Sequence, residues 1–329
     1  MKHYLPVLVL VTLFISNCSR PISTENQSKS SLRLAFYNVE NLFDTIDDPE
    51  KKDEEFTPES KKAHNTDKYT RKRANIIQVL EAIEADAFGL CEVENAEVVN
   101  DLIRNSKALQ KKKMRLLHFE SPDQRGIDNA LIFSEKKFKV IDSFPVKVDL
   151  GKDSRPTRDI LAVVLKSKND TFCIYVNHWP SRSGGKEKSE GKRMIAGKTL
   201  SETIVKQKAK YPNAHHIALG DLNDHPTDKS VYESLGAKET LNAELINLMY
   251  DEHQSGKGSH AYRGEWGVLD HIIISKSLLG KVDTNFIFSK NWMLYYIKQA
   301  NDSFPGRFYG RDKCYGGYSD HLPVVVDLN

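Results

Sequence analysis

Cysteine is scarce in this chain, and its few cysteines exclude two kinds of scaffold. The 329 residues include Cys18, Cys91, Cys173 and Cys314. Their spacing matches neither a disulfide framework nor the closely spaced pairs of a structural zinc site. Cys91 and Cys173 lie in apolar, strand-like stretches, which indicates buried thiols.

An excess of charge of either sign is also lacking. The chain has 48 Lys and Arg against 45 Asp and Glu, a net charge of +3. This balance excludes a surface that binds nucleic acid over its whole extent, although a local basic patch stays open. Arg71, Lys72 and Arg73 begin a helical stretch and are expected to form a solvated face. Internal repeats and long low-complexity tracts are absent from the sequence.

The one long apolar run lies at the N-terminus. It extends from Leu5 to Ile15, which is short for a membrane span and typical of a secretory signal. The following Ile15-Ser-Asn-Cys18 resembles the lipobox of bacterial lipoproteins, although Asn17 departs from the usual small residue. We expect a signal peptide at residues 1–17, a lipidated Cys18 with a flexible tether over 18–31, and one domain over 32–329.

These N-terminal features predict where the protein is found. We expect it to be exported and anchored by its lipid to a bacterial membrane, at the outer membrane or the cell surface. A plain cleaved signal without lipidation of Cys18 is the alternative.

The most informative stretch is Ala218-Leu-Gly-Asp-Leu-Asn-Asp-His-Pro226. An apolar run predicts a short strand, after which Gly220 is expected to let the backbone turn sharply. Asp221 and Asn223 are two residues apart, so in an extended chain both side chains point to one face. A carboxylate can hold or deprotonate water and a carboxamide can donate to a phosphate oxygen, which suits phosphoester chemistry. An ordinary Asx turn is the alternative.

Five further strand-like stretches carry polar side chains at their ends. Glu92 and Glu94 follow the apolar stretch 87–91, where two carboxylates favour a divalent cation. His178 follows an apolar strand and can donate to a phosphate oxygen or protonate a leaving group. Asp270 lies beside three isoleucines, where orienting a histidine would explain a carboxylate. The remaining polar pairs are Asn38 with Glu40, and Asp320 with His321.

The polar motifs follow one another in a characteristic order. They are Asn38-x-Glu, Glu92-Val, Asn177-His, Gly220-Asp-Leu-Asn, Leu269-Asp-His and Ser319-Asp-His-Leu-Pro. This order resembles the endonuclease/exonuclease/phosphatase superfamily, which includes type I deoxyribonucleases, inositol polyphosphate 5-phosphatases and bacterial sphingomyelinases. The resemblance covers residues 32–329. It implies an α/β fold, a four-layer α/β/β/α sandwich of two mixed sheets with helices outside.

The resemblance also implies a reaction and a set of site residues. The reaction is in-line attack of water on a phosphoester, assisted by Mg²⁺, with Mn²⁺ or Ca²⁺ as alternatives. The catalytic residues implied are His178, Asp221, Asn223, Asp270 and His321. The metal-binding residues implied are Asn38, Glu40, Glu92 and Asp320.

Within that set, the resemblance assigns separate tasks. Glu92 matches the metal-binding glutamate, and Asp221 matches the residue that positions or deprotonates the water. His321 matches the histidine that contacts the scissile phosphate, oriented by Asp270. Which histidine acts as the acid stays open.

Cations on loops near the strand ends are the candidates for substrate binding. Arg158, Arg182 and Arg311 are predicted to bind phosphate, and tyrosines near Arg311 to stack bases. We expect a monomeric, nuclease-like phosphodiesterase with a phosphoester substrate such as nucleic acid and no protein partner. A phosphatase or phospholipase-C-type enzyme for inositol phosphates or sphingomyelin-like lipids is the alternative. A non-catalytic surface-binding lipoprotein is a third interpretation.

Overall fold

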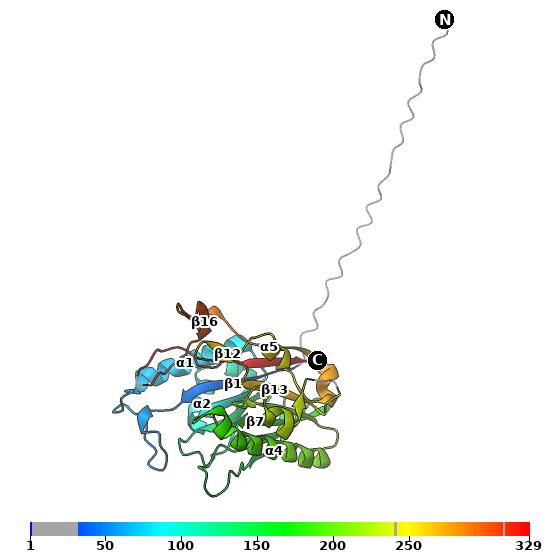
Figure 1. Cartoon of the computed structure of the whole chain (residues 1–329), viewed down its shortest axis with the longest axis horizontal. Helices are drawn as coiled ribbons and strands as arrows, with labels where there is room; N and C mark the ends of the chain where they lie inside the picture. Colours follow the sequence, from blue (N-terminus) through cyan, green and yellow to red (C-terminus); the bar gives the residue numbers. More distant parts are fainter. Residues whose placement is uncertain (2–31, 240–241, 312) are drawn as a thin grey trace.

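A computed structural model of the chain describes residues 32–239, 242–311 and 313–329, together with Met1 (Figure 1). The predicted signal peptide, Cys18 and tether lie outside these residues, so the expectations for them stay predictions. Among the described helices, none is long and apolar enough to cross a membrane.

Two mixed β-sheets form the centre of the fold. In spatial order, the six-stranded sheet contains β14 (Val282–Ile287), β17 (Val324–Leu328), β1 (Leu32–Leu42), β2 (Ala87–Val93), β4 (Asp128–Ser134) and β3 (Met114–His118). The seven-stranded sheet contains β5 (Lys139–Val146), β6 (Ile160–Ser167), β7 (Asp170–His178), β8 (His215–Asp221), β13 (Asp270–Ser275), β10 (Leu245–Asn247) and β9 (Ala237–Lys238).

The remaining described elements are helices and two small hairpins. The α-helices are α1 (Thr66–Ile83), α2 (Ala96–Arg104), α3 (Lys107–Lys112), α4 (Lys186–Lys210) and α5 (Tyr250–Gln254). The shorter helical turns are η1 (Glu54–Phe56), η2 (Ser230–Leu235), η3 (Lys276–Lys281) and η4 (Asn291–Met293). The hairpins pair β11 (His260–Tyr262) with β12 (Glu265–Gly267), and β15 (Leu294–Ile297) with β16 (Asp302–Pro305).

The side chains of β1 show how the layers form. Alternate residues of a strand point to opposite faces of its sheet. Leu34 and Phe36 are buried between the two sheets, whereas Ala35 and Tyr37 are buried on the outer face of the first sheet. Because both faces of β1 are covered, its residues from Leu34 to Tyr37 are apolar or aromatic without alternation, as is typical of strands inside a layered fold.

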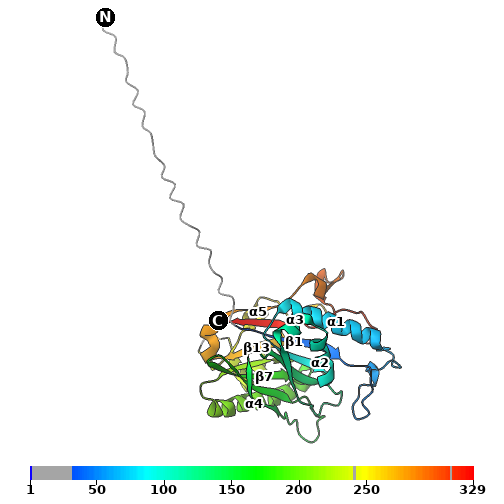
Figure 2. The ribbon, with the colours of Figure 1, turned by 180° about the vertical axis from the view of Figure 1, so that it is seen from behind.

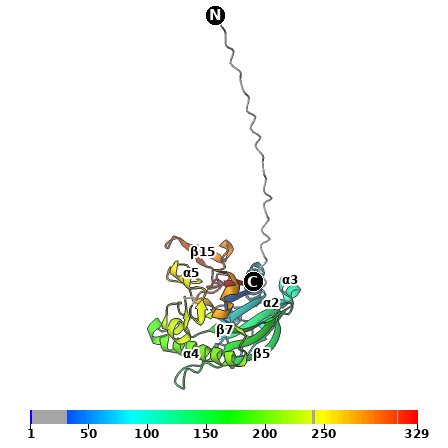
Figure 3. The same cartoon turned by 90° about the vertical axis from the view of Figure 1, so that its right-hand side faces the viewer.

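Helices cover the two outer faces. On α1, Ile76, Leu80 and Ile83 recur at helical spacing and pack on the first sheet. On α4, Leu200 and Ile204 pack on the second sheet. Figures 2 and 3 show α4 on the opposite side of the sheets from α2 and α3. The predicted four-layer sandwich is therefore confirmed.

Candidate active site

Strand register brings side chains from distant parts of the chain to one place. His178 at the end of β7 pairs with Asp221 at the end of the parallel strand β8. Asp221 in turn pairs with Asp270 at the start of the antiparallel strand β13. From the other sheet, Asn38 Nδ2 donates to Asp221 Oδ2 at 3.0 Å. Both sheets therefore contribute to the site.

Both β1 and β2 are irregular where they reach this site. Their pairing shifts between Asn38 and Leu42, and the pairing of β2 with β4 shifts at Glu92. Glu92 has a φ of 60°, a left-handed value that is uncommon for residues other than glycine. Bulges redirect side chains, and such backbone strain is concentrated at functional sites. Here it directs the Glu92 carboxylate to the Asn41 N–H at 2.9 Å and the Asn38 amide at 3.4 Å.

His321 is held between two carboxylates. Its Nδ1 lies 2.7 Å from Oδ2 of the buried Asp270, and its Nε2 lies 3.8 Å from Asp221 Oδ2. Burial alone lowers the pKa of His321, but the two carboxylates outweigh it and hold that pKa well above its usual value. The ring is therefore oriented by Asp270 and favours the imidazolium form.

His178 has the opposite electrostatic setting. Burial lowers the pKa of His178 well below its usual value, and Arg158 adds to the effect. Its Nε2 lies 3.7 Å from Asp221 Oδ2 and 3.8 Å from Glu92 Oε1. The site thus pairs a neutral histidine with a charged one.

Asp221 lies at the centre of these groups. Burial raises the pKa of Asp221 to about 7, against the opposing effect of His321. Its Oδ1 accepts the Asn223 N–H at 2.9 Å, which fixes the carboxylate plane. A carboxylate with a pKa near neutrality is suited to exchange a proton with water.

The carboxylates of Glu92 and Asp221 fit a divalent cation. Both are largely buried, and within the described chain their only ion-pair partners closer than 4 Å are histidines. Two buried carboxylates without Lys or Arg need another positive charge, and oxygen ligands suit Mg²⁺, Mn²⁺ or Ca²⁺. Asn38, Glu92 and Asp221 are the residues that would hold the ion. Asp221, Asp270 and His321 also form a group whose ligand atoms lie within 4.8 Å of one another.

Alternation along a regular strand would place the Glu40 side chain on the same face as Asn38. In the structure Glu40 does not join this group. The carboxylate of Glu40 accepts backbone N–H groups from Phe308 at 2.6 Å and Tyr309 at 3.0 Å, and lies 3.8 Å from Lys72 Nζ. The irregular turn of β1 at Glu40, with a φ of 52°, explains the difference, because alternation holds only in a regular strand. In this geometry Glu40 anchors the loop 306–318 to β1.

Asp320 lies at the edge of the site, next to His260, a residue that the sequence analysis did not single out. Asp320 Oδ2 accepts from Arg307 Nη2 at 2.7 Å. His260, Asp320 and His321 place ligand-type atoms within 4.8 Å of one another. The rings of His260 and His321 are 4.6 Å apart between centroids. His260 lies in a polar segment without a preceding apolar run, so no strand-end signal marked it.

The three predicted phosphate-binding arginines have different settings. Arg158 is buried and donates to the carbonyl oxygens of His178 and Trp179, with Asp123 as its ion-pair partner. Arg182 donates to the Asn223 carbonyl and pairs with Asp228, while about a quarter of its side chain is exposed. Arg311 is exposed and lines a cavity beyond Asp320. Arg158 thus fixes the end of β7 from within the protein.

Gly220 serves close packing instead of the predicted sharp turn. It lies inside β8, and its φ is not among the positive values. A Cβ at Gly220 would lie 2.6 Å from both Cβ and the carbonyl oxygen of Asn177 on β7. The missing side chain therefore lets β7 and β8 approach each other next to His178 and Asp221.

Gly220→Ala is expected to lower the free energy of unfolding by about 1–3 kcal/mol, because backbone atoms must move to accept the methyl group. Gly191→Ala in α4 is the matched control, since nothing lies within 4 Å of its added Cβ. That change is expected to stabilise the helix by about 1 kcal/mol. Urea unfolding of both variants measures the difference, and equal stability of the two would contradict the packing argument.

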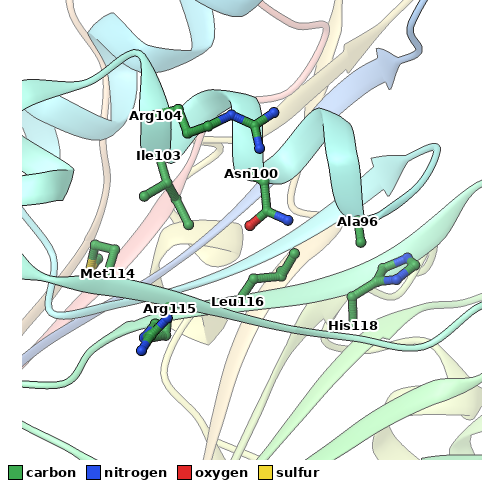
Figure 4. Close-up of a pocket in the computed structure, with 8 residues that line it drawn as sticks. All are labelled: Ala96, Asn100, Ile103, Arg104, Met114, Arg115, Leu116 and His118. Carbon is green, nitrogen blue, oxygen red and sulfur yellow. The ribbon is translucent and has the colours of Figure 1, made fainter.

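Two cavities open on either side of His260. One, of about 660 Å³, is lined by Arg182, Asn223 and His321 among others. The second, of about 880 Å³, includes Asp320. A cavity of about 440 Å³ between α2 and β3 contains none of the predicted site residues (Figure 4). The site is thus open on two sides.

The chain belongs to the endonuclease/exonuclease/phosphatase family, whose model matches residues 33–329. Members of this superfamily are hydrolases that act on phosphoester bonds. The family membership agrees with the two mixed sheets and with the carboxylates, amides and histidines at their strand ends. A search of curated proteins finds no relative that matches this chain.

Solved structures with the same fold include bacterial and human proteins. An endonuclease/exonuclease/phosphatase family protein from Bacteroides thetaiotaomicron is 16% identical with a TM-score of 0.60, and the match covers 90% of this chain and 94% of that one. A mannosyl-6-phosphatase from the same organism is 16% identical with a TM-score of 0.58, covering 91% and 99%. The human nocturnin catalytic domain is 18% identical with a TM-score of 0.54, covering 91% and 94%. At this identity the likeness shows the fold alone.

Proposed function

We propose that the protein is a divalent-metal-dependent phosphodiesterase, nuclease-like in its substrate, that hydrolyses its substrate by in-line attack of water. The observation that carries the proposal is the position of Asp221 between His178 and His321, with Asn38 and Asn223 as its hydrogen-bond partners. Family membership supports the phosphoester chemistry.

In this proposal the attacking water is held by Asp221. Its Oδ2 is too far from either histidine Nε2 for a direct hydrogen bond, at 3.7 and 3.8 Å. All three atoms are therefore available to a water or to phosphate oxygens. Asp221 takes the proton of the water as its oxygen bonds to phosphorus, because burial has raised the pKa of the Asp221 carboxyl towards neutrality. The P–O bond opposite the water breaks, and the leaving alkoxide takes a proton from solvent or from the His321 imidazolium.

The two histidines stabilise the charge of the phosphoryl group. The imidazolium of His321, kept in place by Asp270, places a positive N–H towards the phosphate oxygens. His178 donates from a neutral ring and so adds a hydrogen bond without repelling the imidazolium. When bound, the divalent cation supplies further charge neutralisation of the phosphate. Phosphoryl transfer depends mainly on such positioning and charge stabilisation.

A diester is favoured over a monoester because the site is open on both sides of His260. A diester carries a substituent on each side of the reacting phosphorus, and each cavity can take one of them. A phosphate monoester would occupy only one.

The test is hydrolysis by the purified protein of bis-p-nitrophenyl phosphate, p-nitrophenyl phosphate, single-stranded DNA, RNA, inositol phosphates and sphingomyelin. We expect turnover of the diesters with Mg²⁺ or Mn²⁺, loss of at least 100-fold on chelation, and recovery when the ion is restored. Preference for the monoester or inositol phosphates would favour a phosphatase, and preference for sphingomyelin a phospholipase-C-type enzyme. No turnover on any of them would favour a binding protein on the same scaffold.

A further inference from the structure

The cavity beyond Asp320 is rich in aromatic side chains. Six of them face it from four segments of the chain: Tyr262, Trp292, Tyr295, Phe304, Tyr315 and Tyr318. The hairpin of β15 and β16 forms one wall, with Tyr295 opposite Phe304 in its register. Trp292 and Tyr318 lie against each other with ring centroids 4.8 Å apart.

Several of these rings are exposed to solvent over about half of their surface or more. The exposed fractions are 65% for Tyr262, 46% for Tyr295 and 59% for Tyr315. Exposed aromatic side chains that gather round one cavity are typical of a binding surface. The flat π-faces suit a flat ligand.

Cations accompany the aromatic side chains. Arg263, Arg307 and Arg311 line the same cavity, and among its described lining residues the one carboxylate is Asp320, which is paired with Arg307. The lining therefore carries an excess of positive charge. This combination favours an aromatic group that is attached to an anion, because arginine stacks on planar rings and binds phosphate.

The cavity adjoins the candidate active site. His260 lines both cavities, and its ring contacts His321. Asp320, adjacent to His321, lines the aromatic cavity as well. A substrate whose phosphate lies at His321 would therefore have this cavity next to it, across His260 and Asp320.

We propose that this aromatic cavity binds a nucleobase of an unpaired nucleotide whose phosphate is hydrolysed at the candidate active site. The inference rests on the proposed function and adds the substrate class: single-stranded nucleic acid. Base–aromatic stacking is tolerant of sequence, so we expect recognition of bases without strong preference among them. A base within a duplex is already stacked and cannot enter.

Other occupants fit the lining less well. An acyl chain would call for aliphatic walls, and among the described lining residues the larger aliphatic side chains are Leu294 and Ile297, with Ala261 and Pro305 beside them. A second copy of the chain would cover Asp320 and His260, which lie next to His321. The combination of tyrosine, tryptophan and arginine instead matches the groups that bind bases in single-strand binding proteins.

Tyr295 and Tyr296 provide a matched pair of variants. They are neighbours on β15, but Tyr295 lines the cavity, whereas Tyr296 does not and donates to Asn301 instead. We would measure binding of the full protein to a thymidine tetranucleotide and to its abasic analogue, by calorimetry with chelator present so that no cleavage occurs. Turnover of the same two compounds is then measured with Mg²⁺.

Tyr295→Ala is expected to weaken binding of the thymidine tetranucleotide roughly 5- to 100-fold and to leave the abasic analogue unchanged. Tyr296→Ala should change neither. Equal binding of the two compounds by the unchanged protein, or equal effects of the two variants, would overturn the cavity assignment. The assignment would also be overturned if Tyr295→Ala weakened binding to sphingomyelin vesicles but left binding of the tetranucleotide unchanged.

The two proposals fail separately in this design. If base-dependent binding is present without Mg²⁺-dependent cleavage, the cavity assignment stands as a binding site and the proposed function fails. If cleavage is present but insensitive to the base, the proposed function stands and the cavity assignment fails.

Discussion

Asp221→Asn is expected to lower kcat about 10²- to 10⁴-fold, with a smaller change in KM. The amide has the same shape and still accepts the Asn223 N–H through its oxygen, so the fold should be retained. It cannot take a proton from water, and it removes one of the carboxylates that would hold the cation. The loss should therefore be concentrated in the chemical step.

Two measurements define this result. Steady-state kinetics on bis-p-nitrophenyl phosphate gives kcat and KM, and thermal unfolding in chelator confirms that the variant is folded. Asp142→Asn is the control, because this carboxylate on β5 is paired with Lys210 at the surface. It should leave both constants unchanged. Activity within threefold of the unchanged protein in Asp221→Asn would mean that the base lies elsewhere.

His321 provides an independent check on the same assignment. His321→Asn should lose a similar factor, since it removes the positive N–H that Asp270 orients. Residues that act together in one step are not additive. The double variant is therefore expected to lose much less than the product of the two single losses.

Arg193→Met is expected to destabilise the protein by about 3–5 kcal/mol, the largest stability effect that we predict. Arg193 Nε lies 2.6 Å from Asp224 Oδ2, and both side chains are buried. This ion pair joins α4 to the loop that follows Asp221. Removing the Arg193 guanidinium leaves the buried Asp224 carboxylate with Ser230 and Arg182 as its remaining partners.

A double-mutant cycle separates the ion pair from simple packing. We expect Arg193→Met and Asp224→Leu each to lower the free energy of urea unfolding, and the double variant to recover much of the loss. Lys198→Met is the control, since its pair with Glu202 on α4 is exposed and such pairs contribute little. A loss below 1 kcal/mol for Arg193→Met would contradict the assignment.

Much of the fold and of the site follows from the sequence because strand ends are marked by a change from apolar to polar residues. His178, Asp221, Asp270 and His321 each stand at such a change, and register then brings them together. The pairing of neighbouring strands fixes which residues lie side by side. Four local signals are therefore enough to locate the centre of the candidate site.

The failures have a common physical origin. The direction of Glu40 depends on an irregular backbone, and the role of Gly220 on the approach of Asn177, a residue far away in the sequence. Lys72, expected on a solvated face, is fully buried and donates to the Tyr318 carbonyl. None of these depends on a local pattern. Each is decided by what another segment of the chain places next to it.

The pairing of the first and last strands has a consequence for how the protein becomes functional. Leu32 at the start of β1 pairs with Leu328 at the end of β17, and His321 lies shortly before that strand, separated from it by Leu322 and Pro323. Neither the first sheet nor the cluster around Asp221 is complete until β17 pairs with β1. Contacts this distant in sequence also slow folding. The candidate site around Asp221 therefore forms only when the two ends of the segment 32–329 have come together.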